Sequence, residues 1–220
     1  MVNALAAEGA GVILTGRSID KLNRVFADLP DHGGQVHCME LDLADLEDIR
    51  QFGKHIREKS GKIDILFHCA ALYGSNSWLD SSVDELDELY RTNVRGSFAL
   101  TQLLLPFLIE SQGDVVFINS SVSTFDGANV GQYAATKHAL RGLANSLRAE
   151  VNQKGVRVLS VYPGRTATPL QEKIFQAEHK NYQPELLLQP EDIASMVIAC
   201  LKLPATAEVT ELHMRPKQKM

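Results

Sequence analysis

Apolar residues in this chain follow two periods that alternate along its length. Short continuous apolar runs, such as residues 12–14 and 63–67, have the length and composition of buried strands. Longer segments place apolar residues three and four positions apart, as amphipathic helices do. We predict strands within residues 12–15, 35–41, 63–67, 114–119, 156–161 and 208–213, and helices at about 18–27, 45–57, 92–109, 130–151 and 190–203. Ser82 and Glu85 have the spacing of a capping box that opens one more helix.

This alternation predicts one α/β domain over residues 1–220, a doubly wound parallel sheet of Rossmann-like, three-layer α/β/α form. Ligands bind such sheets beyond the carboxyl ends of the strands. The residues that stand out chemically fall at those ends: Arg17, Asp42, Cys69-Ala70-Ala71, Ser120-Ser121 and Pro163-Gly164. Their placement favours an enzyme with its site along one edge of the sheet.

Composition excludes several other classes of protein. The net charge is -5, which gives no electrostatic reason to expect nucleic acid or an anionic membrane as a partner. No segment is long and apolar enough to predict a membrane span, and no signal peptide is visible at the start. Cys38, Cys69 and Cys200 lack metal-ligand spacing, so we expect reduced, buried thiols in a cytoplasmic protein without a metal site.

The candidate chemistry centres on Tyr133 and Lys137. On a helix these two residues share a face, so the lysine ammonium is expected near the phenol and to lower the tyrosine pKa from its reference of about 10. A tyrosine tuned in this way can exchange a proton during catalysis, and a serine from the pair Ser120-Ser121 can hold a carbonyl or alkoxide oxygen. The chain has five tyrosines, so the spacing can also arise by chance.

From about residue 5 to residue 208 the chain resembles the short-chain dehydrogenase/reductase family. Its elements occur in order: an asparagine on a helix, a serine, Tyr-x-x-x-Lys, and a Pro-Gly-x-x-x-Thr segment. They correspond to Asn93, Ser120-Ser121, Tyr133, Lys137 and Pro163-Gly164-Arg165-Thr166-Ala167-Thr168. The resemblance implies that Tyr133 exchanges a proton with the substrate, that Lys137 assists it and binds the nicotinamide ribose, and that Asn93 holds a water in a proton relay.

Either member of the serine pair can be the residue that positions the substrate oxygen. The family usually places this serine thirteen residues before the tyrosine, which selects Ser120. The second serine of such a pair normally takes the role, which selects Ser121. We assign the role to Ser121 and expect Ser120 to cap the strand end.

The resemblance also implies a dinucleotide site. Arg17 follows the strand at whose carboxyl end the family distinguishes NADP(H) from NAD(H). A positive charge there suits the 2′-phosphate that NADP(H) has and NAD(H) lacks. Asp42 and Leu43 look like the pair that contacts adenine, although an aspartate before a helix is also a common cap. We further expect cofactor contacts from Ala70, Tyr133, Lys137, Pro163, Gly164, Thr166 and Thr168, with helix capping as the alternative for the two threonines.

Two features depart from the family pattern. His68-Cys69-Ala70-Ala71 stands where the family has Asn-Asn-Ala-Gly, and we expect His68 to be a packed or hydrogen-bonded strand residue rather than a catalyst. The chain also starts with what looks like the end of the family's first helix, without the preceding strand and its glycine-rich turn. Gly9 and Gly11 precede a strand and Gly33-Gly34 is expected in a turn, so neither pair replaces that motif.

Three explanations fit this start: an incorrect start position, a fragment, or a true short variant that binds dinucleotide weakly. The retained Asn93, serine pair, Tyr133 and Lys137 favour the first two. The leading hypothesis is an NADP(H)-dependent oxidoreductase that interconverts a small-molecule carbonyl and a secondary alcohol.

The rival hypothesis is a non-catalytic scaffold or interaction protein. Under either hypothesis we expect a homodimer or homotetramer formed through the helices near 92–109 and 130–151. Residues 171–188 are expected to cover the substrate pocket, and their mixed composition favours no particular substrate.

Overall fold

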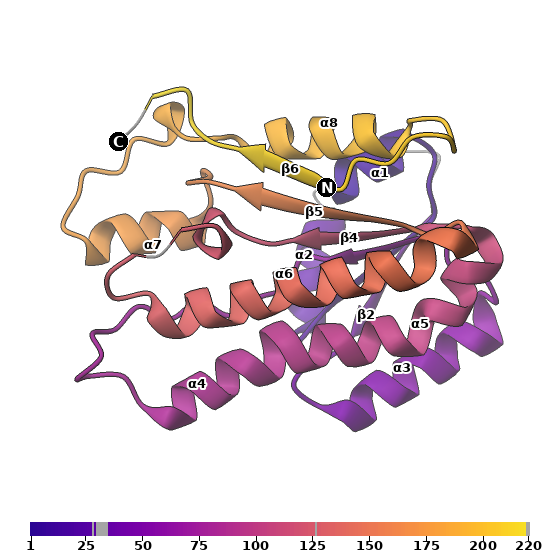
Figure 1. The fold of residues 1–220 in the computed structure, drawn as a ribbon, viewed down its shortest axis with the longest axis horizontal. Coiled ribbons are helices and arrows are strands. Elements are labelled where there is room, and N and C mark those ends of the chain that lie inside the picture. Colours follow the sequence, from indigo (N-terminus) through magenta and orange to yellow (C-terminus); the bar gives the residue numbers. More distant parts are fainter. Residues whose placement is uncertain (28, 30–34, 126, 219–220) are drawn as a thin grey trace.

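The computed structural model describes residues 1–27, 29, 35–125 and 127–218. Helices cover both faces of a layer of parallel strands, which confirms the predicted α/β class (Figure 1). The expected turn at Gly33-Gly34 lies outside the described residues. The strands are β1 (Val12–Gly16), β2 (Val36–Glu40), β3 (Ile65–His68), β4 (Asp114–Ile118), β5 (Arg157–Pro163) and β6 (Glu211–Met214).

The helices agree with the predicted segments to within a few residues. α8 and α1 lie on one face of the strand layer, and α6, α5 and α3 lie on the other (Figure 1). They are α1 (Val2–Ala7), α2 (Ile19–Ala27), α3 (Leu46–Lys59), α4 (Val83–Tyr90), α5 (Ser97–Ser111), α6 (Gly131–Val151), α7 (Pro169–Ala177) and α8 (Pro190–Leu201), with the 3-10 turns η2 (Ser121–Ser123), η3 (Asn152–Lys154) and η4 (Pro184–Leu186).

The strand layer is divided into two hydrogen-bonded sheets. β1 pairs only with β2, with Val12 opposite Val36, while the larger sheet has the order β3-β4-β5-β6. Within the described residues no ladder joins β1 to β3, so each of these strands has one unpaired edge. Every residue of β1 is accordingly partly exposed, whereas the central residues of β4 and β5 are buried.

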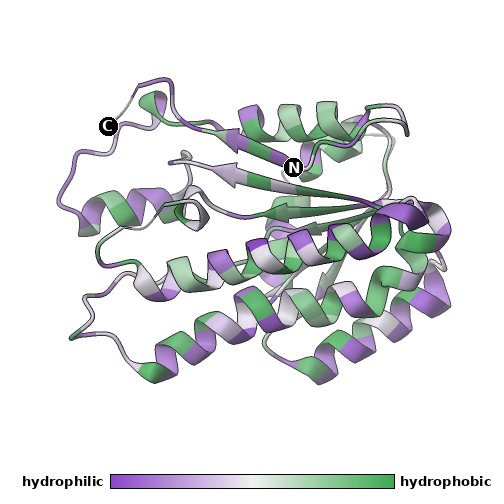
Figure 2. Ribbon diagram, in the orientation of Figure 1, coloured by the Kyte–Doolittle hydropathy of each residue, from purple (hydrophilic) through white to green (hydrophobic). Residues whose placement is uncertain are grey.

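A shared core holds the two sheets together despite this division. One cluster of buried residues joins Leu41, which follows β2, to Leu66 and Val115 of the larger sheet and to α3, α5 and α6. A second cluster packs Val116 and Leu159 against α8 on the other face. Figure 2 shows the strands as mainly hydrophobic, as expected for a sheet that is covered on both sides.

The segment predicted as one long helix, 92–109, contains an irregularity. α4 runs directly into a π-helical turn, η1 (Arg91–Gly96), which then continues as α5. The extra residue in a π turn displaces the side chains beside it, and such turns often occur at functional sites. Asn93 lies in this turn and is buried.

The predicted capping box before α4 is only half formed. The Ser82 hydroxyl accepts a hydrogen bond from the Glu85 backbone N–H, as expected for an N-cap. The Glu85 carboxylate instead accepts a hydrogen bond from Asn76. In the part of the chain that the structure describes, no helix is long and apolar enough to cross a membrane.

Candidate active site

The end of β4 is fastened to α6 by Asn119, which sequence reasoning did not single out. Its amide nitrogen donates to the backbone carbonyl of Lys137 at 3.2 Å, and its amide oxygen accepts from the Ser120 N–H at 2.9 Å. Asn119 is buried, so these bonds are shielded from water. The link places the serine pair beside the first two turns of α6, where Tyr133 and Lys137 lie.

Tyr133 and Lys137 share one face of α6, as their spacing predicts. The Lys137 ammonium lies 5.7 Å from the centre of the Tyr133 ring and donates a hydrogen bond to the Ile118 carbonyl at 3.2 Å. Only 2% of the Lys137 surface is exposed. Removal from water disfavours the charged amine, and burial lowers the pKa of Lys137 to about 8.

The expected lowering of the Tyr133 pKa is wrong for this structure. Burial raises the pKa of Tyr133 to about 12, because desolvation of the phenolate outweighs a hydrogen bond with Ser120, which acts in the opposite direction. The neighbouring Tyr73 raises this pKa further. At neutral pH Tyr133 therefore carries its proton, the form that can donate to a carbonyl oxygen.

The structure brings Ser120, rather than Ser121, to Tyr133. The Ser120 side chain shares a hydrogen bond with Tyr133. Its hydroxyl also accepts a hydrogen bond from the Val122 N–H, so Ser120 is the N-cap of η2. Ser121 begins η2, and its carbonyl accepts hydrogen bonds from the backbone and the hydroxyl of Thr124. The capping role expected of Ser120 is confirmed, but the same residue also contacts Tyr133.

Asn93 joins three segments of the site. Its amide oxygen accepts from the Leu72 N–H at 2.7 Å, and its amide nitrogen donates to the Leu72 carbonyl at 2.9 Å and to the Thr136 hydroxyl at 3.1 Å. Its backbone carbonyl accepts from Ser97. The side chain thus ties the loop after β3 to α6, next to Tyr133.

His68 is a structural residue, as predicted. Its Nε2 lies 2.7 Å from the Thr101 hydroxyl, and its ring stacks on Phe117 with centroids 4.7 Å apart. Burial, with a smaller effect from the Lys137 charge, lowers the pKa of His68 to about 3. The imidazole therefore stays neutral at physiological pH.

The expected cysteine environment needs a correction. All three thiols are free, but Cys38 and Cys200 are only partly buried and Cys69 is exposed. Cys69 directly follows β3. Within the described residues no group of histidines, cysteines and carboxylates could hold a metal ion.

The residues predicted for the adenine end of a dinucleotide lie at the carboxyl ends of β1 and β2. Arg17 directly follows β1 and is exposed. The Asp42 carboxylate accepts from the Ala44 N–H at 2.9 Å, while Asp45 caps α3, so the capping alternative for Asp42 is wrong. The Leu43 side chain belongs to the core.

The segment predicted for the nicotinamide end continues from β5. A Cβ on Gly164 would lie 3.3 Å from Pro216, so the chain passes closely beside the segment that follows β6. The Thr166 hydroxyl donates to the Gly164 carbonyl. The Thr168 hydroxyl accepts from the Gln171 N–H and caps α7, which confirms the capping alternative for Thr168 but not for Thr166. Ala70 is exposed at the end of β3.

These residues fit the two ends of a dinucleotide better than its middle. Arg17 and Asp42 follow β1 and β2, and Tyr133, Lys137 and Thr166 lie on the part of the chain predicted to contact the nicotinamide half. Among the described residues, however, Gly9 and Gly11 lie at the amino end of β1, on the opposite edge from the site. They cannot form a pyrophosphate cradle, which requires a glycine turn at a strand's carboxyl end.

Comparison with known proteins identifies relatives for nearly the whole chain. A family model described as short chain dehydrogenase matches residues 1–179. An uncharacterized oxidoreductase of Staphylococcus haemolyticus is 29% identical over 214 residues, covering 97% of this chain and 89% of the relative.

Solved structures give the same result. An alcohol dehydrogenase from Thermococcus sibiricus, complexed with 5-hydroxy-NADP, matches with a TM-score of 0.87 and 27% identity, covering 100% of this chain and 91% of the other. The closed form of a serine dehydrogenase complexed with NADP+ also matches with a TM-score of 0.87, at 26% identity, covering 100% and 92% of the two chains.

Proposed function

Because the chain belongs to the short-chain dehydrogenase family, and so is an oxidoreductase, we propose that it interconverts a carbonyl and a secondary alcohol with NADP(H). The observation that carries this proposal is the contact of Ser120 with the Tyr133 phenol beside the buried Lys137 ammonium. These three groups surround the position where a substrate oxygen would sit.

In this mechanism the substrate oxygen accepts hydrogen bonds from the Tyr133 phenol and the Ser120 hydroxyl. When the substrate is reduced, Tyr133 transfers its proton to that oxygen. The Lys137 ammonium then stabilises the phenolate, because an opposite charge nearby favours the ionised form. A bound nicotinamide supplies the hydride acceptor or donor. Lys137 and Tyr133 would hold its ribose, and Asn93 would hold a relay water.

We assign the positioning of the substrate oxygen to Ser120. Its hydroxyl shares a hydrogen bond with Tyr133, and it stands at the thirteen-residue spacing that is usual for the family. Ser121 lies one residue further along, at the start of η2. We propose that the substrate is a small carbonyl or alcohol and that the protein acts in the cytoplasm.

NADP(H) is the preferred cofactor in this proposal. Arg17 supplies a positive charge at the end of β1, and the two matched dehydrogenase structures hold 5-hydroxy-NADP and NADP+. The family's first strand and glycine turn have no counterpart in the residues that the structure describes. A parallel strand between the free edges of β1 and β3 would pair with both and place its turn over the site. We propose that tight NADP(H) binding requires that strand.

Tyr133→Phe tests the catalytic role. The variant keeps the ring and its packing but removes the only proton that Tyr133 can give, so NADPH-dependent reduction of a carbonyl panel should fall by at least about 100-fold. Fluorescence titration with NADPH should show binding weakened by no more than about tenfold, because one ribose hydrogen bond is lost. Full activity in Tyr133→Phe would sink the mechanism.

The divided sheet favours a second candidate, a non-catalytic scaffold. Without a strand between β1 and β3 the cofactor would lack its pyrophosphate site, and the retained helices could still bind a partner. The intact mass of the protein from its source cells separates the two. A mass about 1.5–2 kDa above 24.2 kDa would match a strand and glycine turn, and a mass equal to 24.2 kDa would favour the scaffold.

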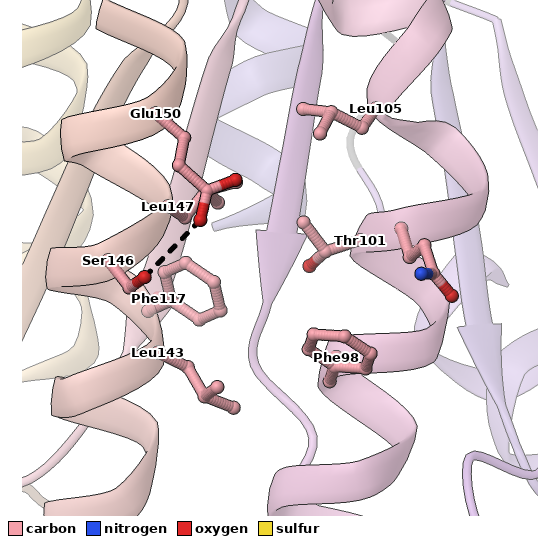
Figure 3. Close-up of a pocket in the computed structure, with 9 residues that line it drawn as sticks. Phe98, Thr101, Leu105, Phe117, Leu143, Ser146, Leu147 and Glu150 are labelled. Carbon is pink, nitrogen blue, oxygen red and sulfur yellow. Dashed lines mark hydrogen bonds between the residues drawn. The ribbon is translucent and has the colours of Figure 1, made fainter.

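The faces of α5 and α6 support the expected homodimer or homotetramer. α5 carries only one charged residue, Glu110, although it lies on the outside of the molecule. A groove of about 210 Å³ separates α5 from α6 (Figure 3), and its rim residue Phe98 is 50% exposed. An apolar helix of this kind is normally covered. We propose that a second copy covers it, with Phe98 at the contact.

A further inference from the structure

A second tyrosine contacts the catalytic one. The Tyr73 ring meets the Tyr133 ring edge-on, with centroids 5.0 Å apart and planes at 63°. This is a favourable arrangement for two aromatic rings, worth about 0.5–1.5 kcal/mol beyond the area they bury. Tyr73 lies in the loop between β3 and α4, so the contact joins distant parts of the chain.

The loop that carries Tyr73 is held firmly on the side of Leu72. Both the N–H and the carbonyl of Leu72 are bonded to the Asn93 side chain, at 2.7 and 2.9 Å. Because Asn93 is buried in the π-helical turn, this pair of bonds fixes the backbone directly before Tyr73. The position of the Tyr73 ring is therefore tied to the same residue that contacts α6 through Thr136.

The loop is also anchored on the other side of Tyr73. Gly74 is buried against α4, and a Cβ there would lie 2.8 Å from the Glu85 carboxylate and 3.1 Å from the Leu89 side chain. Two residues later, the Asn76 amide donates to Glu85 at 2.8 Å. With Leu72 and Gly74 both fixed, the Tyr73 ring has a defined position against Tyr133.

We propose that Tyr73 is a positioning residue that holds the Tyr133 ring in the orientation needed for proton transfer. Ser120 holds the phenol oxygen and Lys137 lies beside the ring, but neither contact supports the ring against sideways tilting about the Cα–Cβ bond, which would move the phenol oxygen. The Tyr73 ring, packed against the Tyr133 ring, limits that tilt. Small displacements of a reacting group lower rates steeply, so loss of this contact should reduce turnover. The inference rests on the proposed oxidoreductase function.

The experiment compares Tyr73→Phe, Tyr73→Ala and Tyr73→Leu with the unchanged protein. Tyr73→Phe keeps the ring and should retain kcat within about twofold, while the alanine and leucine variants should lose about tenfold in kcat, with KM changed less than about threefold. Tyr90→Ala is the matched control, because this half-exposed tyrosine of α4 is outside the site and should leave kcat unchanged. Circular dichroism would confirm folding.

Ultraviolet titration of tyrosinate gives a readout that does not depend on turnover. Tyr133 is identified by the difference between each protein and its Tyr133→Phe version. In Tyr73→Ala the Tyr133 phenol should be more accessible to water and should titrate closer to the reference of about 10.

The outcomes separate this inference from the proposed function. An active enzyme in which Tyr73→Ala and Tyr73→Leu keep full kcat overturns the positioning role, and so does one in which Tyr73→Phe is as impaired as Tyr73→Ala. If the unchanged protein reduces none of the carbonyl probes, the proposed function fails. The titration then decides, and an unchanged Tyr133 titration in Tyr73→Ala overturns the role of Tyr73.

Discussion

The Lys137 ammonium lies 5.7 Å from the centre of the Tyr133 ring, yet it is almost fully buried and donates to the Ile118 carbonyl. A buried lysine without a carboxylate partner in the described residues is destabilising, because its charge has lost water without gaining an opposite charge. The chain therefore keeps Lys137 at a cost in stability. Removing the Lys137 charge should therefore change both the stability and the activity of the protein.

Replacing Lys137 with methionine should stabilise the fold while it abolishes turnover. The pKa of Lys137 is about 8 in the folded state and about 10.4 in the unfolded chain, so below pH 8 the folded state bears a constant penalty of about 3 kcal/mol. Between these values the unfolded state binds more protons, and the stability of the unchanged protein rises with pH.

Urea unfolding between pH 7 and 10.5 measures this effect. Lys137→Met should be more stable by about 3 kcal/mol at pH 7, and the difference should shrink as the pH rises above 8. Lys62→Met is the control, because Lys62 is an exposed lysine and should show no such trend. A Lys137→Met protein less stable than the original at pH 7 would contradict the prediction.

Alanine at Ser120 and at Ser121 should have very different effects. Ser120→Ala removes the hydroxyl that contacts Tyr133, so kcat should fall by about 100-fold, as for loss of one donor to a reacting oxygen. Ser121→Ala should retain activity within about threefold. Steady-state kinetics of the two variants decides the assignment, and the reverse order would return the role to Ser121.

His68 should make the protein sensitive to acid. Its pKa is about 3 in the folded state and about 6.5 in the unfolded chain, so the unfolded state binds more protons between these values. Stability should be complete above pH 6.5 and fall below it, by about 3 kcal/mol at pH 4.5.

Denaturant unfolding of His68→Asn tests this dependence. The variant can still bond Thr101 but does not titrate, so its stability should fall less between pH 6.5 and 4.5. His55→Asn, on the exposed side of α3, is the control and should keep the acid sensitivity of the original. Equal pH profiles for His68→Asn and the unchanged protein would show that another group causes the acid loss.

Phe98→Asp should reduce the size of the assembly. A carboxylate at the rim of the α5/α6 groove would be buried without a partner when a second copy docks there, which costs several kcal/mol. Light scattering after size-exclusion chromatography should show a smaller particle. Met196→Asp changes a similarly exposed apolar residue on α8 and should leave the assembly intact. An unchanged mass for Phe98→Asp would place the interface elsewhere.

Local sequence pattern predicted what depends on local physics. Hydrophobic periods identify strands and helices because burial of one face selects the spacing, and helix geometry alone places Tyr133 and Lys137 on one face. The parallel order places the residues that follow successive strands at one edge of the sheet, as for Ser120 after β4 and Gly164 after β5. The capping role of Thr168 also follows from its position before Pro169.

Tertiary structure decided what depends on neighbours from other segments. The sign of the Tyr133 pKa shift depends on how much water the fold removes, and the exposure of Cys69 depends on where β3 leaves the core. The choice between Ser120 and Ser121 needed the hydrogen bond between Ser120 and Tyr133, which residue spacing alone does not determine. Tyr73 could not be recognised from the sequence, because the Asn93 bonds to Leu72 and the packing of Gly74 against α4 bring it to Tyr133 only in the folded chain. Sequence by itself determined the kind of chemistry, whereas long-range packing decided which groups perform it, since desolvation and orientation arise only when distant segments meet.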